Sequence, residues 1–167
     1  MAAWSPSDIS IQERFYPNMT CFGCGPANSK GLRLRSFAVD DDVVAVFLPG
    51  PEHDNGLGFL NGGIICTVLD CHSAAAVVSI AEQRSWTTQA GAGYVTAGLE
   101  VAFRRPTPLD VPLDLRARVT MASQGEMHVE AELSWDGKVR ADARSVWKPS
   151  RARPHGSRPT VAEGTST

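Results

Sequence analysis

One carboxylate stands alone in the longest apolar segment of the chain. Residues 64–81 read IICTVLDCHSAAAVVSIA, and Asp70 is the only acid among them. An ionised aspartate with apolar neighbours is costly to bury, so Asp70 needs dedicated hydrogen-bond partners. Such carboxylates are frequent where a side chain acts as a nucleophile or a base. The pattern also allows a structural role, in which Asp70 caps a neighbouring loop or lies on an exposed stripe of a helix.

The sequence before this segment is suited to binding a negatively charged oxygen. Leu60-Asn61-Gly62-Gly63 leads directly into the apolar run. Two glycines at a helix start let a ligand approach unpaired backbone N–H groups, where the helix dipole also favours negative charge. Donors of this kind stabilise the oxyanion that forms when a carbonyl is attacked.

The spacing of these two features predicts an assembly. Gly62 and Asp70 are eight residues apart, which is about 12 Å along a helix axis. An oxyanion donor and an attacking group must both lie about 3 Å from one reacting centre, so one helix cannot supply both to the same carbonyl. Two antiparallel copies can. If both residues are catalytic, we expect a two-fold homodimer with two shared sites, and dimers that could pair further into a tetramer.

The rest of the sequence predicts the elements that position this helix. Alternation of apolar and polar residues is typical of strands with one covered face. It marks three segments after the helix, which are 95–103, 113–121 and 127–135. A last strand, 138–147, is expected after the Asp136-Gly137 turn, and two strand-like runs, 32–39 and 43–48, precede the helix. Asp40-Asp41-Asp42 and Asp136-Gly137 predict tight turns. Because the helix is apolar on nearly every side, it must be enclosed. We therefore predict an α+β fold with a curved antiparallel sheet wrapped around one long central helix.

Composition narrows the class of protein. The 167 residues are 43% apolar and 20% charged, with a formal net charge of −2, as in a single globular domain. Nothing in this balance points to nucleic acid or a membrane surface, and Asp70 and His72 argue against a membrane-spanning segment. The start lacks a secretory signal pattern and the four cysteines suit a reducing compartment, so we expect a cytoplasmic protein.

Three regions are predicted along the chain. Residues 1–17 form an N-terminal segment with a short helix at 10–16, where Ser10 and Glu13 have the spacing of a capping box. Residues 18–148 form the folded domain. Residues 149–167 are rich in Pro, Ser, Thr, Gly and Arg, and we expect them to be a disordered tail.

Three segments in this order resemble the hotdog-fold acyl-CoA thioesterases of the phenylacetate-pathway group. They are Cys21-Phe-Gly-Cys-Gly-Pro-Ala-Asn28 with Gly31-Leu32, the helix entrance Asn61-Gly62-Gly63 followed by Asp70, and the strand from Thr96 to Arg104-Arg105-Pro106. The resemblance covers roughly residues 18–148. It implies a hotdog fold and hydrolysis of an acyl-CoA to a free acid and CoA, with no cofactor.

The resemblance also implies roles for individual residues. Asp70 would be the nucleophile or the general base. Gly62, with Gly63 beside it, would donate to the oxyanion. Asn55 would orient the attacking water or the thioester, and the hydroxyl of Thr96 would help to position water.

Asn61 departs from the pattern, because that group carries a histidine at this position. The departure keeps a non-catalytic acyl-CoA-binding dimer as an alternative. A hotdog enoyl-CoA hydratase or dehydratase is a further alternative, but such an enzyme normally pairs a histidine with an acid, and no histidine stands at the helix or its entrance in a position to do so.

Two other features allow more than one interpretation. Arg104 and Arg105, at a strand end, could bind the phosphates of CoA or form a solvated surface. Cys21 and Cys24 have the spacing of half a zinc knuckle or of a redox pair. Cys66 and Cys71 are five residues apart on the helix and match a second ligand pair poorly, so no metal site is predicted.

Overall fold

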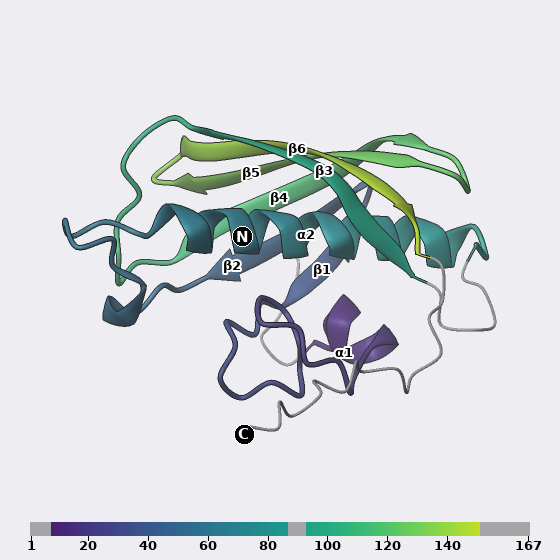
Figure 1. The fold of residues 1–167 in the computed structure, drawn as a ribbon, viewed down its shortest axis with the longest axis horizontal. Coiled ribbons are helices and arrows are strands. Elements are labelled where there is room, and N and C mark those ends of the chain that lie inside the picture. The colour runs from purple at the N-terminus through teal and green to yellow at the C-terminus, as the bar shows by residue number, and fades with distance from the viewer. Residues whose placement is uncertain (1–7, 87–92, 151–167) are drawn as a thin grey trace, which may run out of the picture.

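The computed structural model describes residues 8–86 and 93–150 (Figure 1). In chain order the elements are α1 (Ile11–Phe15), β1 (Ser36–Val39), β2 (Asp42–Phe47), the 3-10 helix η1 (Pro51–His53), α2 (Gly62–Gln83), β3 (Tyr94–Phe103), β4 (Leu113–Ala122), β5 (Met127–Trp135) and β6 (Lys138–Pro149). The six strands of this part of the chain form one antiparallel sheet in the order β1-β2-β4-β5-β6-β3.

The long helix α2 lies across the inner face of this sheet, as Figure 1 shows. Its apolar residues and the inward residues of β4, β5 and β6 form one buried core. By length and hydropathy alone α2 could cross a membrane, but 56% of its apolar window is buried within the fold, as expected for the core helix of a globular domain. The curved sheet around one central helix confirms the predicted α+β hotdog architecture.

Most predicted elements are present with shifted ends. The short N-terminal helix is α1, and Ser10 and Glu13 form its capping box. The first strand begins at Ser36 and not at residue 32, because the N–H groups of Leu32 and Leu34 donate to the carbonyls of Phe22 and Gly23 instead of to a strand. Residues 151–167, most of the predicted tail, lie outside the described residues.

Two turns close as two-residue loops. Asp136 and Gly137 both have positive φ angles, which is the conformation of the hairpin turn that Asp-Gly favours. The loop between β1 and β2 is shorter than predicted, because Asp42 already pairs with Val39 as the first residue of β2.

A chain of buried polar groups joins α1, β1 and α2. The amide oxygen of Gln12 accepts from Ser36 N–H, and Gln12 Nε2 donates to Ser36 Oγ. His72 Nδ1 lies 3.0 Å from Ser36 Oγ, and His72 Nε2 lies 3.0 Å from the Val43 carbonyl oxygen. His72 is therefore a core residue, fully buried and with a polar partner at each ring nitrogen.

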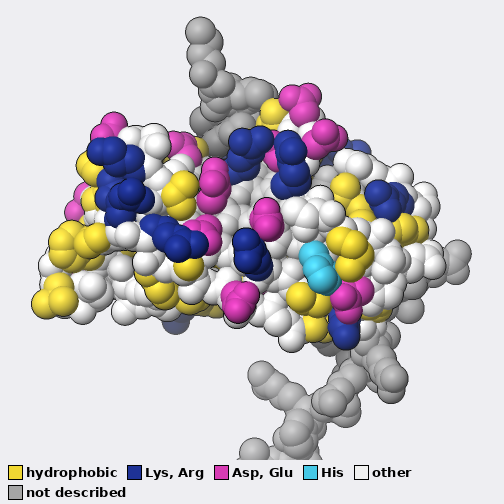
Figure 2. All heavy atoms as spheres, turned by 90° about the horizontal axis from the view of Figure 1, so that it is seen from above, with side chains coloured by type: hydrophobic (Ala, Val, Ile, Leu, Met, Phe, Trp, Pro, Cys, Tyr) yellow, Lys and Arg dark blue, Asp and Glu magenta, His cyan; other side chains and the backbone are white. Residues whose placement is uncertain are grey.

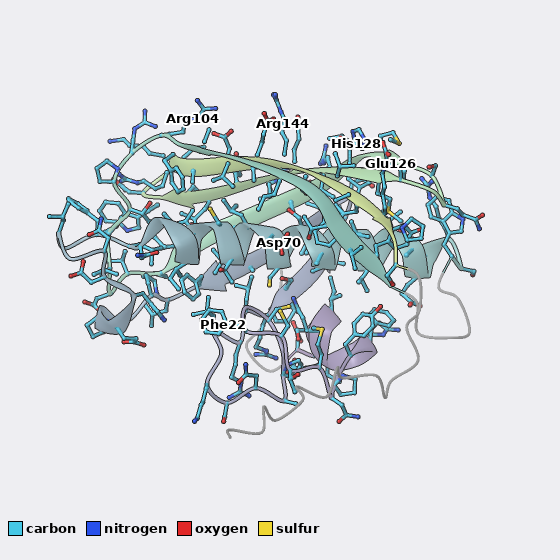
Figure 3. The ribbon with its side chains drawn as sticks, viewed as in Figure 1. Phe22, Asp70, Arg104, Glu126, His128 and Arg144 are labelled. Carbon is cyan, nitrogen blue, oxygen red and sulfur yellow. The ribbon has the colours of Figure 1, made fainter. Side chains whose placement is uncertain are left out.

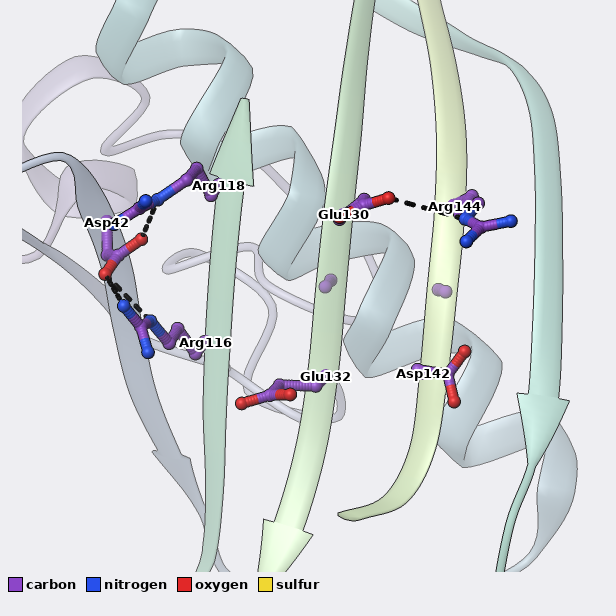
Figure 4. A pocket seen from close by; sticks show the side chains of 9 residues that line it. Asp42, Arg116, Arg118, Glu130, Glu132, Asp142 and Arg144 are labelled. Atoms are coloured by element: carbon purple, nitrogen blue, oxygen red, sulfur yellow. Dashed lines mark hydrogen bonds and ion pairs between the residues drawn. The ribbon is translucent and has the colours of Figure 1, made fainter. Parts of the chain in front are cut away.

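The outer face of the sheet carries ion pairs. Figure 2 shows basic and acidic side chains interspersed over this face, and Figure 4 shows the pairs that cross between strands. Arg118 and Arg116 both hydrogen-bond to the carboxylate of Asp42 and hold its pKa below the usual range. Glu130 pairs with Arg144. The charged residues on β4, β5 and β6 occupy the polar positions of the alternating pattern in the sequence. The apolar positions of the same strands therefore face inward and form the core.

Candidate active site

Asp70 has a dedicated hydrogen-bond donor. It lies half-buried near the middle of α2, where Figure 3 labels it. The hydroxyl of Thr96, on β3, donates to Asp70 Oδ1 at 2.7 Å. A hydroxyl that donates to one carboxylate oxygen fixes the rotamer of the carboxylate and leaves its second oxygen available for a proton or an electrophile.

A bulge in β3 brings Thr96 to this position. Thr96 pairs with Trp147 and Gly98 pairs with Val146, so Ala97 has no partner of its own on β6. A bulge changes which side chains face inward. The regular alternation predicted for 95–103, with Thr96 opposite the apolar face, is therefore interrupted at its start, and Thr96 faces α2.

An apolar pocket of about 450 Å³ opens beside Asp70. It lies between α1, α2 and β3, and Asp70 and Thr96 belong to its wall. Most of the remaining wall is apolar, with contributions from Ile11, Met19, Ala74, Val78, Tyr94 and Trp147. A carboxylate at the edge of an apolar pocket of this kind can act on a polar centre that carries an apolar chain. The hollow on the outer sheet face, in contrast, is lined mainly by charged and ion-paired residues.

The two glycines at the start of α2, Gly62 and Gly63, differ in whether their backbone N–H groups are hydrogen-bonded. Asn61 is the N-cap, and its side-chain oxygen accepts from Gly63 N–H at 2.8 Å. The N–H of Gly63 is therefore engaged within the chain, and the predicted role as a second oxyanion donor would require it to leave Asn61. The N–H of Gly62, the first helical residue, has no hydrogen-bond acceptor within the described part of the chain. Asparagine is among the best N-cap residues, so Asn61 orders the entrance by a means that sequence reasoning missed.

Asn55 and the two arginines lie away from Asp70. The side-chain oxygen of Asn55 accepts from Leu57 N–H and stabilises the loop before α2. Arg104 forms a two-pronged ion pair with Asp142 on the outer face of the sheet. The guanidinium of Arg105 donates to the Val139 carbonyl. Within one chain these residues gather around the N-terminal end of α2 and the neighbouring end of β3, where Figure 3 places Arg104, and not around Asp70.

Three cysteines meet next to Asp70. The sulfur atoms of Cys21, Cys24 and Cys71 lie within 4.8 Å of one another, and all three thiols are free. Hydrogen bonds from Cys71 and Cys21 lower the pKa of the Cys24 thiol. The sequence did not predict this cluster, because Cys71 lies 50 residues after Cys21 in the chain and only the tertiary fold brings it to Cys21 and Cys24.

The sheet, the enclosed helix and the acid at its centre define a hotdog-fold protein. A sequence profile of the thioesterase superfamily matches residues 57–140, about half of the chain. The protein belongs to the thioesterase superfamily, as the resemblance implied. Among curated proteins, none matches the chain.

Solved structures agree with this family. A thioesterase superfamily protein from Shewanella loihica is 28% identical, with a TM-score of 0.59 over 75% of this chain and 98% of that one. A phenylacetic acid degradation-related protein from Ralstonia eutropha is 25% identical, with a TM-score of 0.65 over 83% and 98%. A Streptococcus mutans protein with bound acetyl-CoA shares the fold at 17% identity, with a TM-score of 0.60 over 72% and 90%.

Removing the Thr96 hydroxyl tests whether its hydrogen bond to Asp70 matters for activity. A hydrogen bond to a charged group contributes about 1.5–3 kcal/mol, so Thr96→Val is expected to lower the turnover of any reaction that uses Asp70 by about 10- to 100-fold. Thr120→Val, at an exposed threonine on β4, is the matched control and should keep full activity. Equal kinetic constants for the two variants would show that Thr96 has no role in the reaction.

Proposed function

We propose that the protein is an acyl-CoA thioesterase, with Asp70 as nucleophile or general base and the Gly62 N–H of a second copy as oxyanion donor. The observation that carries the proposal is the half-buried Asp70, held by Thr96 at the wall of an apolar pocket. Attack on the thioester carbonyl would transfer negative charge to its oxygen, and CoA would leave as the thiol after protonation.

The position of Gly62 favours a shared site. Gly62 and Asp70 belong to one continuous helix, so about 12 Å of helix axis separates them within a chain. The edge strand β3 supports pairing of two copies: β6 is its one neighbour in the described sheet, and Val95, Leu99 and Phe103 on it are exposed. An exposed apolar edge is suited to pairing with a second chain.

The substrate class rests on the pocket and on the relatives. An apolar pocket beside the acid suits a hydrocarbon or aromatic acyl group. A protein of the same fold binds acetyl-CoA, which makes acyl-CoA the first class to assay. The bonds that Arg104 and Arg105 make within the chain mean that a role on CoA phosphates would require them to exchange partners.

Thiol release from a panel of acyl-CoAs tests the activity. The panel covers acetyl-CoA, medium and long acyl chains, phenylacetyl-CoA and an enoyl-CoA. We expect stoichiometric formation of free acid and CoA thiol from at least one saturated or aromatic member. Hydration of the enoyl-CoA without thiol release would indicate a hydratase, and saturable binding without any product would indicate an acyl-CoA-binding dimer; either result would refute the proposal.

A charge on the β3 edge tests the shared site. Leu99→Arg is expected to shift the protein to a monomer in light scattering and to abolish thiol release, because an unpaired charge is costly to bury in an interface. Val46→Arg on β2 is the matched control, since Val46 is 38% exposed and Leu99 is 36% exposed. A monomeric Leu99→Arg variant with full activity would show that one chain holds a complete site.

A further inference from the structure

The cysteine cluster beside Asp70 is built from two separate parts of the fold. Cys21 and Cys24 lie on the loop that precedes β1, and Cys71 lies on α2. Cys24 and Cys71 are each only 5% exposed. The cluster lies in the wall of the apolar pocket, so its side toward the pocket is open.

Two glycines let the loop that carries Cys21 and Cys24 pack closely against α2. A Cβ on Gly23 would lie 2.4 Å from Cys71 Sγ, so only glycine lets the loop approach α2 this closely. A Cβ on Gly25 would lie 2.5 Å from Cys21 N, and Gly25 N–H donates to the Cys21 carbonyl oxygen at 2.9 Å. Two glycines without room for a side chain thus wind the Cys-x-x-Cys-Gly turn tightly against Cys71.

One sulfur–sulfur distance matches that across a tetrahedral metal ion, and all three sulfur atoms lie within 4.8 Å of one another. Cys21 Sγ and Cys71 Sγ are 3.7 Å apart. Zinc–thiolate bonds of about 2.3 Å at tetrahedral angles separate sulfur atoms by about 3.8 Å. A disulfide, in contrast, requires about 2.05 Å between the sulfurs. Three thiolates are also the donor set that selects a thiophilic ion over magnesium or calcium.

We propose that Cys21, Cys24 and Cys71 bind one Zn²⁺ ion, with the fourth coordination position directed to the pocket and taken by water or a small ligand. This site is separate from the proposed thioesterase activity and would exist in a protein without it. The ion clamps the loop around residues 21–25 onto α2 and thereby fixes the pocket wall beside Asp70. The three thiols are deprotonated on binding and release their protons to solvent.

Metal content and a spectroscopic probe test the site. The full chain, purified under reducing conditions without a chelator and then reconstituted with zinc, is expected to hold about one zinc ion per chain. Replacing zinc with Co²⁺ should give sulfur-to-cobalt charge-transfer absorption and the intense visible bands of a tetrahedral site. Zinc should raise Tm, because an ion that binds only the folded state stabilises it.

Single replacements assign the ligands. Cys24→Ala and Cys71→Ala should each lose stoichiometric zinc, the cobalt spectrum and the Tm response. Cys66→Ala is the matched control, because Cys66 lies on the same helix outside the cluster, and it should keep all three. Wild-type protein without a cobalt–thiolate spectrum would overturn the proposal even if the variants fail to fold. Equal zinc in the cluster variants and in wild type would also overturn it, as would a disulfide within the cluster in protein that binds no zinc after reduction.

Discussion

Replacing Asp70 with asparagine is expected to lower kcat for thioester hydrolysis by about 10²- to 10⁴-fold, the range typical of losing a general base, while KM changes little. Asparagine has nearly the same volume as aspartate, and its side-chain oxygen can still accept the hydrogen bond from Thr96 that Asp70 accepts at 2.7 Å. The amide can neither attack a carbonyl nor take a proton from water. Thiol release over the acyl-CoA panel is the measurement.

A matched variant separates this effect from a general change in charge. Asp114→Asn removes a carboxylate at an exposed position of β4 and should leave kcat and the dimer unchanged. Light scattering and Tm should show that Asp70→Asn also keeps the wild-type assembly and fold. If Asp70→Asn retains more than about a tenth of the wild-type kcat, a loss of less than about 1.4 kcal/mol in transition-state stabilisation, Asp70 is not the catalytic acid.

A single turnover in water labelled with heavy oxygen distinguishes the two roles of Asp70. If Asp70 deprotonates water, the label enters the acid product in the first turnover. If Asp70 attacks the carbonyl, a mixed anhydride forms and CoA leaves; water that then attacks the aspartyl carbonyl leaves the label on Asp70 and the acid unlabelled. Label on Asp70 after one turnover therefore identifies it as the nucleophile.

The sequence predicted the features that depend on local pattern. The apolar run over 64–81 indicated an enclosed helix, and Asp136-Gly137 indicated a two-residue turn; both are present. The cap at Asn61 was also readable, because asparagine before a helix is a strong N-cap signal.

Features that depend on tertiary pairing could not be read from the sequence. The bulge at Ala97 follows from the register between β3 and β6, which alternation alone does not specify. The ion pair between Arg104 and Asp142 depends on the same register. Cys71 joins Cys21 and Cys24 only because the loop before β1 folds back onto α2. The acid and its helix were therefore predictable from local pattern, and Thr96 was named only through the family resemblance. The bulge, the ion pair and the cysteine cluster could not be predicted without the tertiary fold.

The buried His72 is expected to make the protein less stable in acid. Complete burial lowers its pKa from the ordinary value near 6.5 to about 4. Since the Val43 carbonyl oxygen can only accept, His72 Nε2 carries the proton of the neutral ring, and Nδ1 accepts from the Ser36 hydroxyl. A second proton on Nδ1 would remove that acceptor within the core.

The sign of the pH dependence follows from which state binds the extra proton. Between pH 6.5 and about 4 the unfolded chain protonates His72 and the folded chain does not, so the free energy of unfolding falls as pH falls across this window. A pKa difference of this size corresponds to about 3 kcal/mol. The contribution of neutral His72 is complete above pH 6.5 and lost near pH 4.

His72→Leu isolates this titration from those of all other groups. Near pH 7 the variant should be less stable than wild type by about 1–3 kcal/mol for each buried group left unpaired, namely the Ser36 hydroxyl and the Val43 carbonyl. The advantage of wild type should then shrink as pH falls from 6.5 toward 4. Ser36→Ala, which destabilises the same network but keeps the histidine, should retain an acid-dependent loss. Denaturant unfolding across this pH range measures all three proteins, and a constant difference between wild type and His72→Leu would mean that protonation of His72 does not set acid stability.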